Sequence, residues 1–379
     1  MPEHQETSPG EILRLFLRLG VLGFGGPAAH IALMEREAVE RRRWLSHEQF
    51  LDLVGGCNLL PGPSSTQVAM VLGYTRRGWP GLLIAGICFI VPASLATLAL
   101  AWAYVRYGHF PQAQGLLYGA KPVMVAIIAQ AVWRLGRMAL HGWKLGVLGA
   151  ACLAAAFAGL PPVAILLVAG ALTLAASGLN MRPSSSHGMA WLVTGTAGAS
   201  GAGVVASLVP IALTFLKLGV VVFGSGYVLL AFLHADLIDR LHWITEQQLL
   251  DAITAGQVTP GPVFATATFL GYLLHGWWGA VVATVAIFLP SFFLAGAVGA
   301  LASRIRQSKP AAAFIDGVNV AAVALMAEVA IVLGRATLID GWTWAVGLVS
   351  ALLLLRFRVN ATWLILGGAA FGVLLKGLR

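Results

Sequence analysis

Residues 16–137 of this chain recur as residues 215–335, with a single one-residue gap between the copies. The segment FLRLGVLGFG at 16–25 returns as FLKLGVVVFG at 215–224. Matching residues lie 199 positions apart up to the Pro-Gly-Pro motifs, and 198 positions apart from Gly73 and Gly271 onward. A duplicated apolar chain whose glycine and proline interruptions fall at matching places is typical of a secondary transporter, and the interruptions point to its binding site.

The composition predicts an all-α integral membrane protein with the lipid bilayer as a partner. Mean hydropathy is +0.85, 59% of the residues are apolar and 10% are charged, against about 25% charged in a soluble domain. Apolar runs such as 82–104, 280–301 and 311–333 match the roughly 20 residues that span a bilayer as a helix. Their sequence lacks the alternation of a membrane barrel.

Charge and cysteine content exclude several other classes. The net charge of +9 comes from basic residues scattered between apolar runs, which fits membrane-protein loops better than a nucleic-acid interface. Cys57, Cys88 and Cys152 lie far apart and form neither a metal-binding nor a disulfide pattern. We expect no metal, no cofactor and no nucleic-acid partner.

Basic residues fall at non-equivalent places in the two copies. The first copy holds four arginines within 36–43, whereas its equivalent at 235–242 holds one arginine and two aspartates. The bias then reverses, since 304–309 holds three basic residues and its equivalent holds Arg106 alone. Basic loops mark the cytoplasmic side, so we expect 36–43 and 304–309 to be cytoplasmic loops of an inverted-topology repeat. The predicted domains are an N-terminal repeat (1–180), a cytoplasmic connector leading into the second half (181–203) and a C-terminal repeat (204–379).

Each copy contains a broken segment, at 47–73 and at 246–271, whose arms are too short to span a bilayer. The breaks are Pro61-Gly62-Pro63 and Pro260-Gly261-Pro262. They must interrupt a helix, because proline lacks an N–H group and clashes with the preceding turn. Pro63 and Pro262 are each well placed as the first residue of a new helix. We therefore predict a re-entrant helical hairpin in each copy.

The helix after each break is a candidate anion site. It begins with Ser64, Ser65, Thr66 and Gln67 in the first copy, and with an apolar run followed by Thr266 in the second. Unpaired N–H groups and the positive end of the helix dipole suit an anion at a helix start. In an inverted repeat, both starts would face one small anion near the midplane. The alternative is that the prolines only shape a packed hairpin and the hydroxyls bond their own backbone.

Further candidate positions flank these breaks. Two pairs interrupt apolar segments at equivalent places: Gly25 with Gly26, and Gly224 with Ser225. They either line the same cavity or allow close helix packing. Asn58 and Gln257 each lie three residues before the first proline of a motif. We expect them to fix the hairpin or to contact substrate.

Three ionisable residues lie within apolar runs. Arg18 and Lys217 occupy equivalent positions, and a cation inside the membrane is costly and functional by default. They either bind the anion or extend to the membrane interface. Glu328, equivalent to Gln130, is either a proton carrier or a hydrogen-bonded buried acid.

These motifs resemble the chromate ion transporter (CHR) family. The resemblance rests on FGGPAAHIA at 24–32, on Trp44-Leu45 and Phe50-Leu51-Asp52, and on LPGPSSTQ at 60–67. The duplicated Pro-Gly-Pro is similar to the family's long-chain, two-domain form. The resemblance implies a carrier in the plasma (inner) membrane that exports chromate, a small oxyanion, with sulfate as a further candidate substrate. The second copy departs at 224–226 and 263–265, so we expect the first to supply more polar ligands.

Other readings of the chain are less well supported. An intramembrane enzyme would need a His-Glu-x-x-His, Gly-x-Ser-x-Gly or paired-aspartate motif, and the sequence has none of them. An anion channel and a sulfate carrier or exchanger stay open as alternatives. The sequence also leaves open the driving force and whether the protein forms a homo-oligomer.

Overall fold

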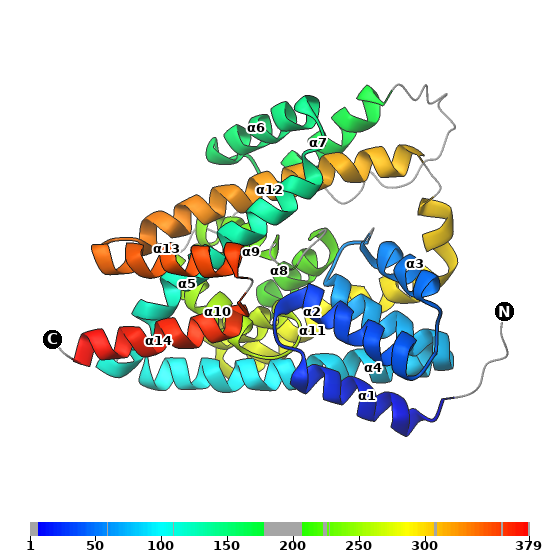
Figure 1. The fold of residues 1–379 in the computed structure, drawn as a ribbon, viewed down its shortest axis with the longest axis horizontal. Coiled ribbons are helices and arrows are strands. Elements are labelled where there is room, and N and C mark those ends of the chain that lie inside the picture. The colour runs from blue at the N-terminus through cyan, green and yellow to red at the C-terminus, as the bar shows by residue number, and fades with distance from the viewer. Residues whose placement is uncertain are drawn as a thin grey trace.

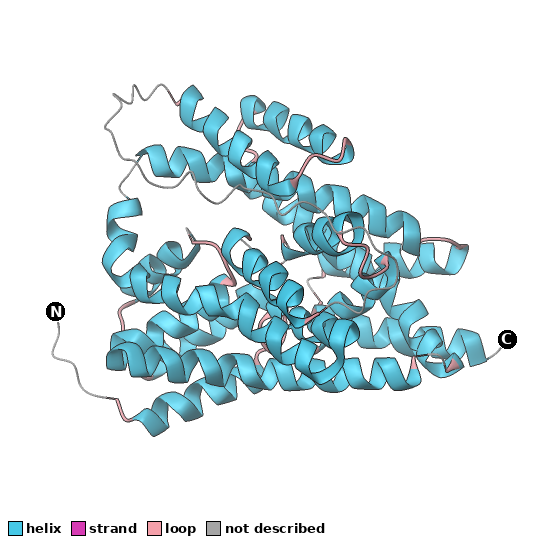
Figure 2. Cartoon of the chain, turned by 180° about the vertical axis from the view of Figure 1, so that it is seen from behind, coloured by secondary structure: helices cyan, strands magenta, loops and turns pink. Residues whose placement is uncertain are grey.

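The computed structural model describes residues 7–58, 60–108, 110–177, 207–222, 226, 228–306, 309–357 and 359–377. Within these ranges the regular elements are all helices (Figure 2), which confirms the predicted all-α class. The predicted connector at 181–203 and the candidate residues Gly224 and Ser225 lie outside the described residues.

Apart from one short 3-10 turn in the second half, the described residues of the two halves form the same succession of elements (Figure 1). The first half comprises α1 (Pro9–Leu22), α2 (Gly26–Glu35), the π-helix η1 (Arg36–Arg41), α3 (His47–Asn58), α4 (Ser64–Tyr107), α5 (Pro111–Ala139), α6 (Trp143–Phe157) and α7 (Pro162–Ala176). The second comprises α8 (Leu208–Val221), α9 (Leu229–Leu233), the π-helix η2 (His234–Arg240), α10 (Glu246–Val258), the 3-10 turn η3 (Val263–Ala265), α11 (Thr266–Arg306), α12 (Lys309–Thr337), α13 (Gly341–Arg356) and α14 (Ala361–Gly377).

The arginine-rich stretch at 36–43 is helical for most of its length, which corrects the expectation of a loop. Its residues continue α2 as η1, and η2 continues α9 in the same way. Each π-helix is followed by an equivalent residue with a left-handed φ of 51°, Arg43 and His242. The basic stretch at 304–309 likewise lies largely within the ends of α11 and α12.

Both α4 and α11 fold back on themselves at a glycine. Gly78 has φ 56° and ψ −144°, and Gly276 has φ 57° and ψ −145°, a conformation that residues with a side chain rarely adopt. The hydroxyls of Thr268 and Thr284 are 16 positions apart in sequence and yet lie 2.7 Å apart. Each of these helices therefore has a short arm (64–76 or 266–274) and a long arm (79–107 or 277–306).

The last helices of each half pack on the other half. Helices α6 and α7 lie along α12, and α13 and α14 lie along α5 (Figure 1). Gly119 of α5 meets the backbone of Gly368 in α14, and the equivalent Gly317 of α12 meets the backbone of Ala169 in α7. Small residues let helix backbones approach this closely. The repeats therefore interlock instead of packing as two separate units.

The long arms carry apolar side chains on their outer faces. Four residues spaced four apart are exposed on each arm: Leu83, Ile87, Val91 and Leu95 on α4, and Val281, Val285, Leu289 and Phe293 on α11. Among the described residues, four helices are long and apolar enough to cross a membrane: Ser64–Tyr107, Pro111–Ala139, Val263–Ala297 and Ala312–Thr337. Continuous apolar strips of this kind suit contact with lipid, and the protein is a multi-pass membrane protein.

Candidate functional site

Each Pro-Gly-Pro tip is hydrogen-bonded to the opposite half. The N–H of Gly62 donates to the carbonyl oxygen of Val222 at 2.7 Å, and the N–H of Gly261 donates to that of Gly23 at 2.8 Å. Val222 and Gly23 are equivalent residues that directly follow α8 and α1. The two kinds of break predicted from the sequence therefore meet crosswise between the repeats.

Glycine is required at both tips. Gly62 and Gly261 have φ values of +108° and +92°, which favour glycine. A Cβ atom on Gly62 would lie 2.7 Å from Ser291 Oγ, and one on Gly261 would lie 2.6 Å from the Cβ of Ala93. Ser291 and Ala93 are themselves equivalent, on the long arms of α11 and α4. Each tip therefore rests against the long arm of the other half.

The start of α4 presents unpaired backbone donors in a buried place. Residues 64–67 are at most 6% exposed, and no side chain caps the helix. Gln67 N donates to Pro63 O at 3.0 Å, whereas the first three N–H groups of an α-helix have no partner within it. The N–H groups of Ser64, Ser65 and Thr66 therefore point out of the helix start, beside their own hydroxyls.

The equivalent start in the second half is tighter and less polar. The second copy has one residue fewer than the first between its Pro-Gly-Pro motif and Gly271. Its chain forms the 3-10 turn η3, in which Ala265 N donates to Pro262 O at 2.9 Å. The N–H of Thr266 is also directed at carbonyl oxygens of η3. More of the backbone donors are thus used internally, and Val263 and Phe264 bring no hydroxyl. The two helix starts offer an anion unequal sets of donors.

Unpaired polar atoms gather around the tips. Ten buried side-chain atoms lack a hydrogen-bond partner among the described residues. Six of them belong to residues within four positions of a Pro-Gly-Pro motif, or at or next to the long-arm residues that face the tips: Thr66 Oγ1, Gln67 Oε1, Ser94 Oγ, Gln257 Nε2, Thr266 Oγ1 and Ser291 Oγ. Buried polar atoms are nearly always paired, so this concentration marks a place suited to a small polar ligand. Ser94 and Ser291 were not predicted from the sequence. The available signal was their closeness to the duplicated prolines Pro92 and Pro290.

His30 joins the tips and was likewise not assigned to the site from the sequence. Its Nε2 lies 2.8 Å from Gly23 O, the oxygen that also accepts from Gly261 N, and its Nδ1 lies 3.4 Å from Ser65 Oγ. The side chain is buried, and its ring meets Phe89 edge to face. The equivalent residue in the second half is Leu229, so only one half has this link.

The other predicted residues lie in several surroundings. Gly26 and Gln257 are buried, with Gly26 in the first turn of α2 and Gln257 near the end of α10. Gly25 and Asn58 are exposed. Glu328 is half-buried in α12.

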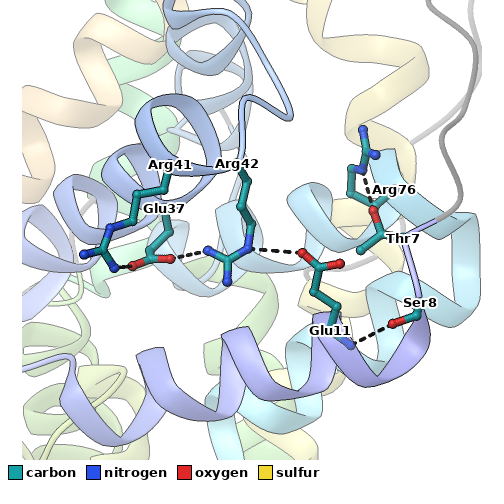
Figure 3. A network of polar contacts seen from close by, with 7 residues as sticks. All are labelled: Thr7, Ser8, Glu11, Glu37, Arg41, Arg42 and Arg76. Atoms are coloured by element: carbon teal, nitrogen blue, oxygen red, sulfur yellow. Dashed lines mark hydrogen bonds and ion pairs between the residues drawn. The ribbon is translucent and has the colours of Figure 1, made fainter.

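The matched cations Arg18 and Lys217 have different surroundings. Lys217 Nζ lies 2.8 and 2.9 Å from the two carboxylate oxygens of Asp236, so its charge is already compensated. In the first half, the equivalent acid Glu37 pairs with Arg41 and Arg42 (Figure 3). Arg18 is exposed and forms no ion pair with a described residue.

A buried ion pair links the halves beside the second hairpin. Asp251 of α10 is 3.1 Å from Lys121 Nζ of α5 and accepts a hydrogen bond from Tyr104 OH of α4 at 3.0 Å. Its side chain is 3% exposed. The equivalent Asp52 is exposed, and Asn319 stands in the place of Lys121. This contact has no counterpart of the same composition in the first half.

Comparison with known proteins agrees with these features. The family model of the chromate transporter matches residues 10–174 and 209–373, which are the two repeats. No solved structure matches the chain. The chain is 33% identical to the chromate transport protein of Cupriavidus metallidurans over 95% of this chain and 91% of the relative.

Two further relatives are similar over most of their length. A probable chromate transport protein of Synechococcus elongatus is 32% identical over 92% of this chain and 90% of the relative. The chromate transport protein of Pseudomonas aeruginosa is 33% identical over 86% and 81%. The family model covers both repeats and three relatives exceed 30% identity, so the chain belongs to the chromate transporter family.

Proposed function

We propose that this protein is a secondary transporter that exports chromate across the plasma membrane and binds the oxyanion at the two Pro-Gly-Pro breaks. The observation that carries the proposal is the buried, uncapped start of α4 against the Gly62 tip. Free N–H groups at a helix start favour an anion, and the unpaired atoms of Gln67 and Ser291 lie beside it. Ser64, Ser65 and Thr66 supply further neutral donors.

The crossing of the long arms supports an inverted repeat. Trp79 of α4 lies against Gly296 of α11, and Gly86 lies against Phe292. Residue numbers rise along one arm as they fall along the other, so the arms run antiparallel at this contact. Two equivalent helices that cross a bilayer in opposite directions give the repeats opposite topology. The short helices on either side of each tip then enter the membrane without crossing it.

Chromate is the substrate favoured by the names of the relatives. Sulfate is the alternative substrate, because backbone N–H groups recognise charge and size more than element. The carboxylate of Asp236 compensates the charge of Lys217, so Lys217 contributes less than the helix starts. Arg18 forms no ion pair with a described residue, and its charge is available to attract anions. A channel would conduct without saturation, whereas a carrier saturates and shows acceleration by substrate on the opposite side.

Flux into liposomes tests the proposal. Purified protein should take up chromate saturably, without chemical change to the anion, and an unlabelled anion on the far side should accelerate the uptake. Gly62→Ala should reduce this flux sharply at low chromate concentration, because it weakens chromate binding. Gly142→Ala is the matched control, because Gly142 has a φ of +94° and a Cβ there meets no atom within 4 Å. Equal flux in Gly62→Ala and wild type would reject the tip as the site.

A further inference from the structure

We infer that His30 is a positioning residue that makes the Ser65 hydroxyl a hydrogen-bond acceptor, so that the site prefers a singly protonated oxyanion to the bare dianion. The inference rests on the proposed function and concerns the form of the substrate that the site takes. It follows from the donor and acceptor requirements of four atoms: Gly23 O, the two His30 ring nitrogens and Ser65 Oγ.

The carbonyl of Gly23 fixes the tautomer of His30. A carbonyl oxygen only accepts hydrogen bonds, so the Nε2 atom at 2.8 Å from it carries the proton. In a neutral ring the other nitrogen then carries none. Nδ1 is therefore an acceptor toward Ser65 Oγ, 3.4 Å away. The Ser65 hydroxyl therefore donates its hydrogen bond to His30 Nδ1. The lone pairs of Ser65 Oγ remain available to accept a hydrogen bond from a ligand.

The surroundings favour the neutral ring. His30 is 1% exposed, and a buried charge without a partner is costly. The elements packed against α2 are α1, α3, α4 and η1. Their basic residues are Arg14 and Arg18 on α1, His47 on α3, Arg76, Arg77 and Arg106 on α4, and Arg36 and Arg41 on η1. Their carboxylates are Glu11 on α1, Glu48 and Asp52 on α3, and Glu37 and Glu40 on η1. All of these carboxylates but Glu37 are exposed, and Glu37 is held by Arg41 and Arg42. No hydrogen bond or ion pair to a described carboxylate is available to balance an imidazolium.

A hydroxyl that offers only lone pairs distinguishes between forms of one substrate. An unprotonated oxyanion oxygen is repelled by it, whereas the O–H of a hydrogen oxyanion donates to it while the other oxygens accept from the N–H groups of α4. Sites built to pair with a ligand O–H discriminate against ligands that lack it. Chromate takes up a proton near neutral pH and sulfate does not. The same arrangement therefore favours chromate over sulfate.

The test is anion-dependent thermal stabilisation of the purified full-length protein, with chromate and sulfate titrated over a range of mildly acidic to mildly alkaline pH. In wild type, the apparent affinity for chromate should rise as pH falls and follow the hydrogen-chromate fraction. Sulfate should bind weakly over the whole range, so it should be several-fold weaker than chromate at mildly acidic pH and approach chromate at mildly alkaline pH. Ser65→Ala should flatten the chromate profile. Ser64→Ala, the matched control one residue earlier, should weaken both anions and keep the profile.

Two changes at His30 separate positioning from packing. His30→Leu copies the second half, where Leu229 is found; it frees the Ser65 proton and should strengthen sulfate binding several-fold. His30→Gln keeps a donor for Gly23 and removes the ring Nδ1, so it should show the same gain if His30→Leu fails to fold. A wild-type chromate profile that is flat with pH, or one unchanged in Ser65→Ala and His30→Gln, overturns the inference alone. A wild type stabilised by neither anion at any pH overturns the proposed function with it.

Discussion

The first and second Pro-Gly-Pro tips have almost the same backbone and unequal side chains. Gly62 and Gly261 share a left-handed φ, and each bonds to the break that ends the first helix of the other half. Ser64 to Gln67 and Ser291 lie around the first tip, whereas the second faces Val263, Phe264 and Ala93. His30 lies between the tips, in contact with Ser65 and with the carbonyl of Gly23 that accepts from Gly261. The duplicated backbone therefore presents a helix start at both tips, while most of the polar side chains are concentrated at the first.

The largest expected effect concerns the ion pair between Asp251 of the second half and Lys121 of the first half. Asp251→Asn should destabilise the protein by about 3–5 kcal/mol, because it leaves the largely buried Lys121 charge, 17% exposed, without its partner. Asp52→Asn, at the exposed equivalent position, should cost far less. Thermal unfolding in detergent measures both. Equal losses would show that the two hairpins are held in the same way.

The next effect compares the tips directly. Gly62→Ala should weaken chromate binding more than Gly142→Ala by about 1–3 kcal/mol, the cost of overpacking against Ser291 and Gln67. Gly261→Ala meets an apolar Ala93 and should disturb stability more than affinity. Ligand-dependent stabilisation and unfolding temperature should be measured on the same samples. An affinity loss confined to Gly261→Ala would place the anion at the second tip.

Two threonines, one at each helix start, allow the donors of the two tips to be compared. Thr66 and Thr266 both have buried hydroxyls without a partner among the described residues. Thr66→Ala should weaken chromate affinity several-fold, as expected from losing a hydrogen bond of about 1 kcal/mol. Thr266→Ala should do less, because η3 uses more of its donors internally. Titration of chromate against each variant distinguishes them, and a larger effect from Thr266→Ala would reverse the assignment.

The matched cations should respond differently to loss of charge. Lys217→Gln removes a partner of Asp236 and should lower stability by about 0–1 kcal/mol, since the pair is partly exposed. Arg18→Gln breaks no described ion pair and should change the rate of anion uptake, with recovery in Arg18→Lys. Unfolding temperature and initial flux are the two measurements. Wild-type uptake in Arg18→Gln would remove that residue from the transport site.

The smallest effect is a difference in acid sensitivity at the first π-helix. Burial alone would raise the pKa of Glu37, but hydrogen bonds and charges of Arg42 and Arg41 outweigh it and lower that pKa below its usual value. The carboxylate thus stabilises the folded protein above its unfolded-state pKa, and this contribution is lost as pH falls through the folded value. Glu37→Gln should therefore be less stable near neutral pH and show a shallower acid decline. Parallel melting curves over the acid range check this.

Much of the architecture could be predicted because its causes are local. Proline removes a donor and glycine tolerates a left-handed φ wherever they occur, so the breaks at 61–63 and 260–262 were recognisable from residue type and repetition. Two local expectations needed correction or completion. The arginines at 36–43 continue α2 as a π-helix, and the matched Gly78 and Gly276 turn α4 and α11 back on themselves.

The sequence by itself determined the helical class, the duplication and the positions of the breaks, because hydropathy, repetition and backbone restriction belong to short stretches of chain. Only the tertiary structure decided which groups meet. Gly62 hydrogen-bonds to Val222, Lys217 pairs with Asp236, and His30 contacts Ser65. These contacts depend on how distant helices cross and on which half supplies each face. A hydrogen bond requires its donor and acceptor atoms to lie within a few tenths of an ångström of the right distance. The order of residues alone does not give the distances between atoms of distant segments.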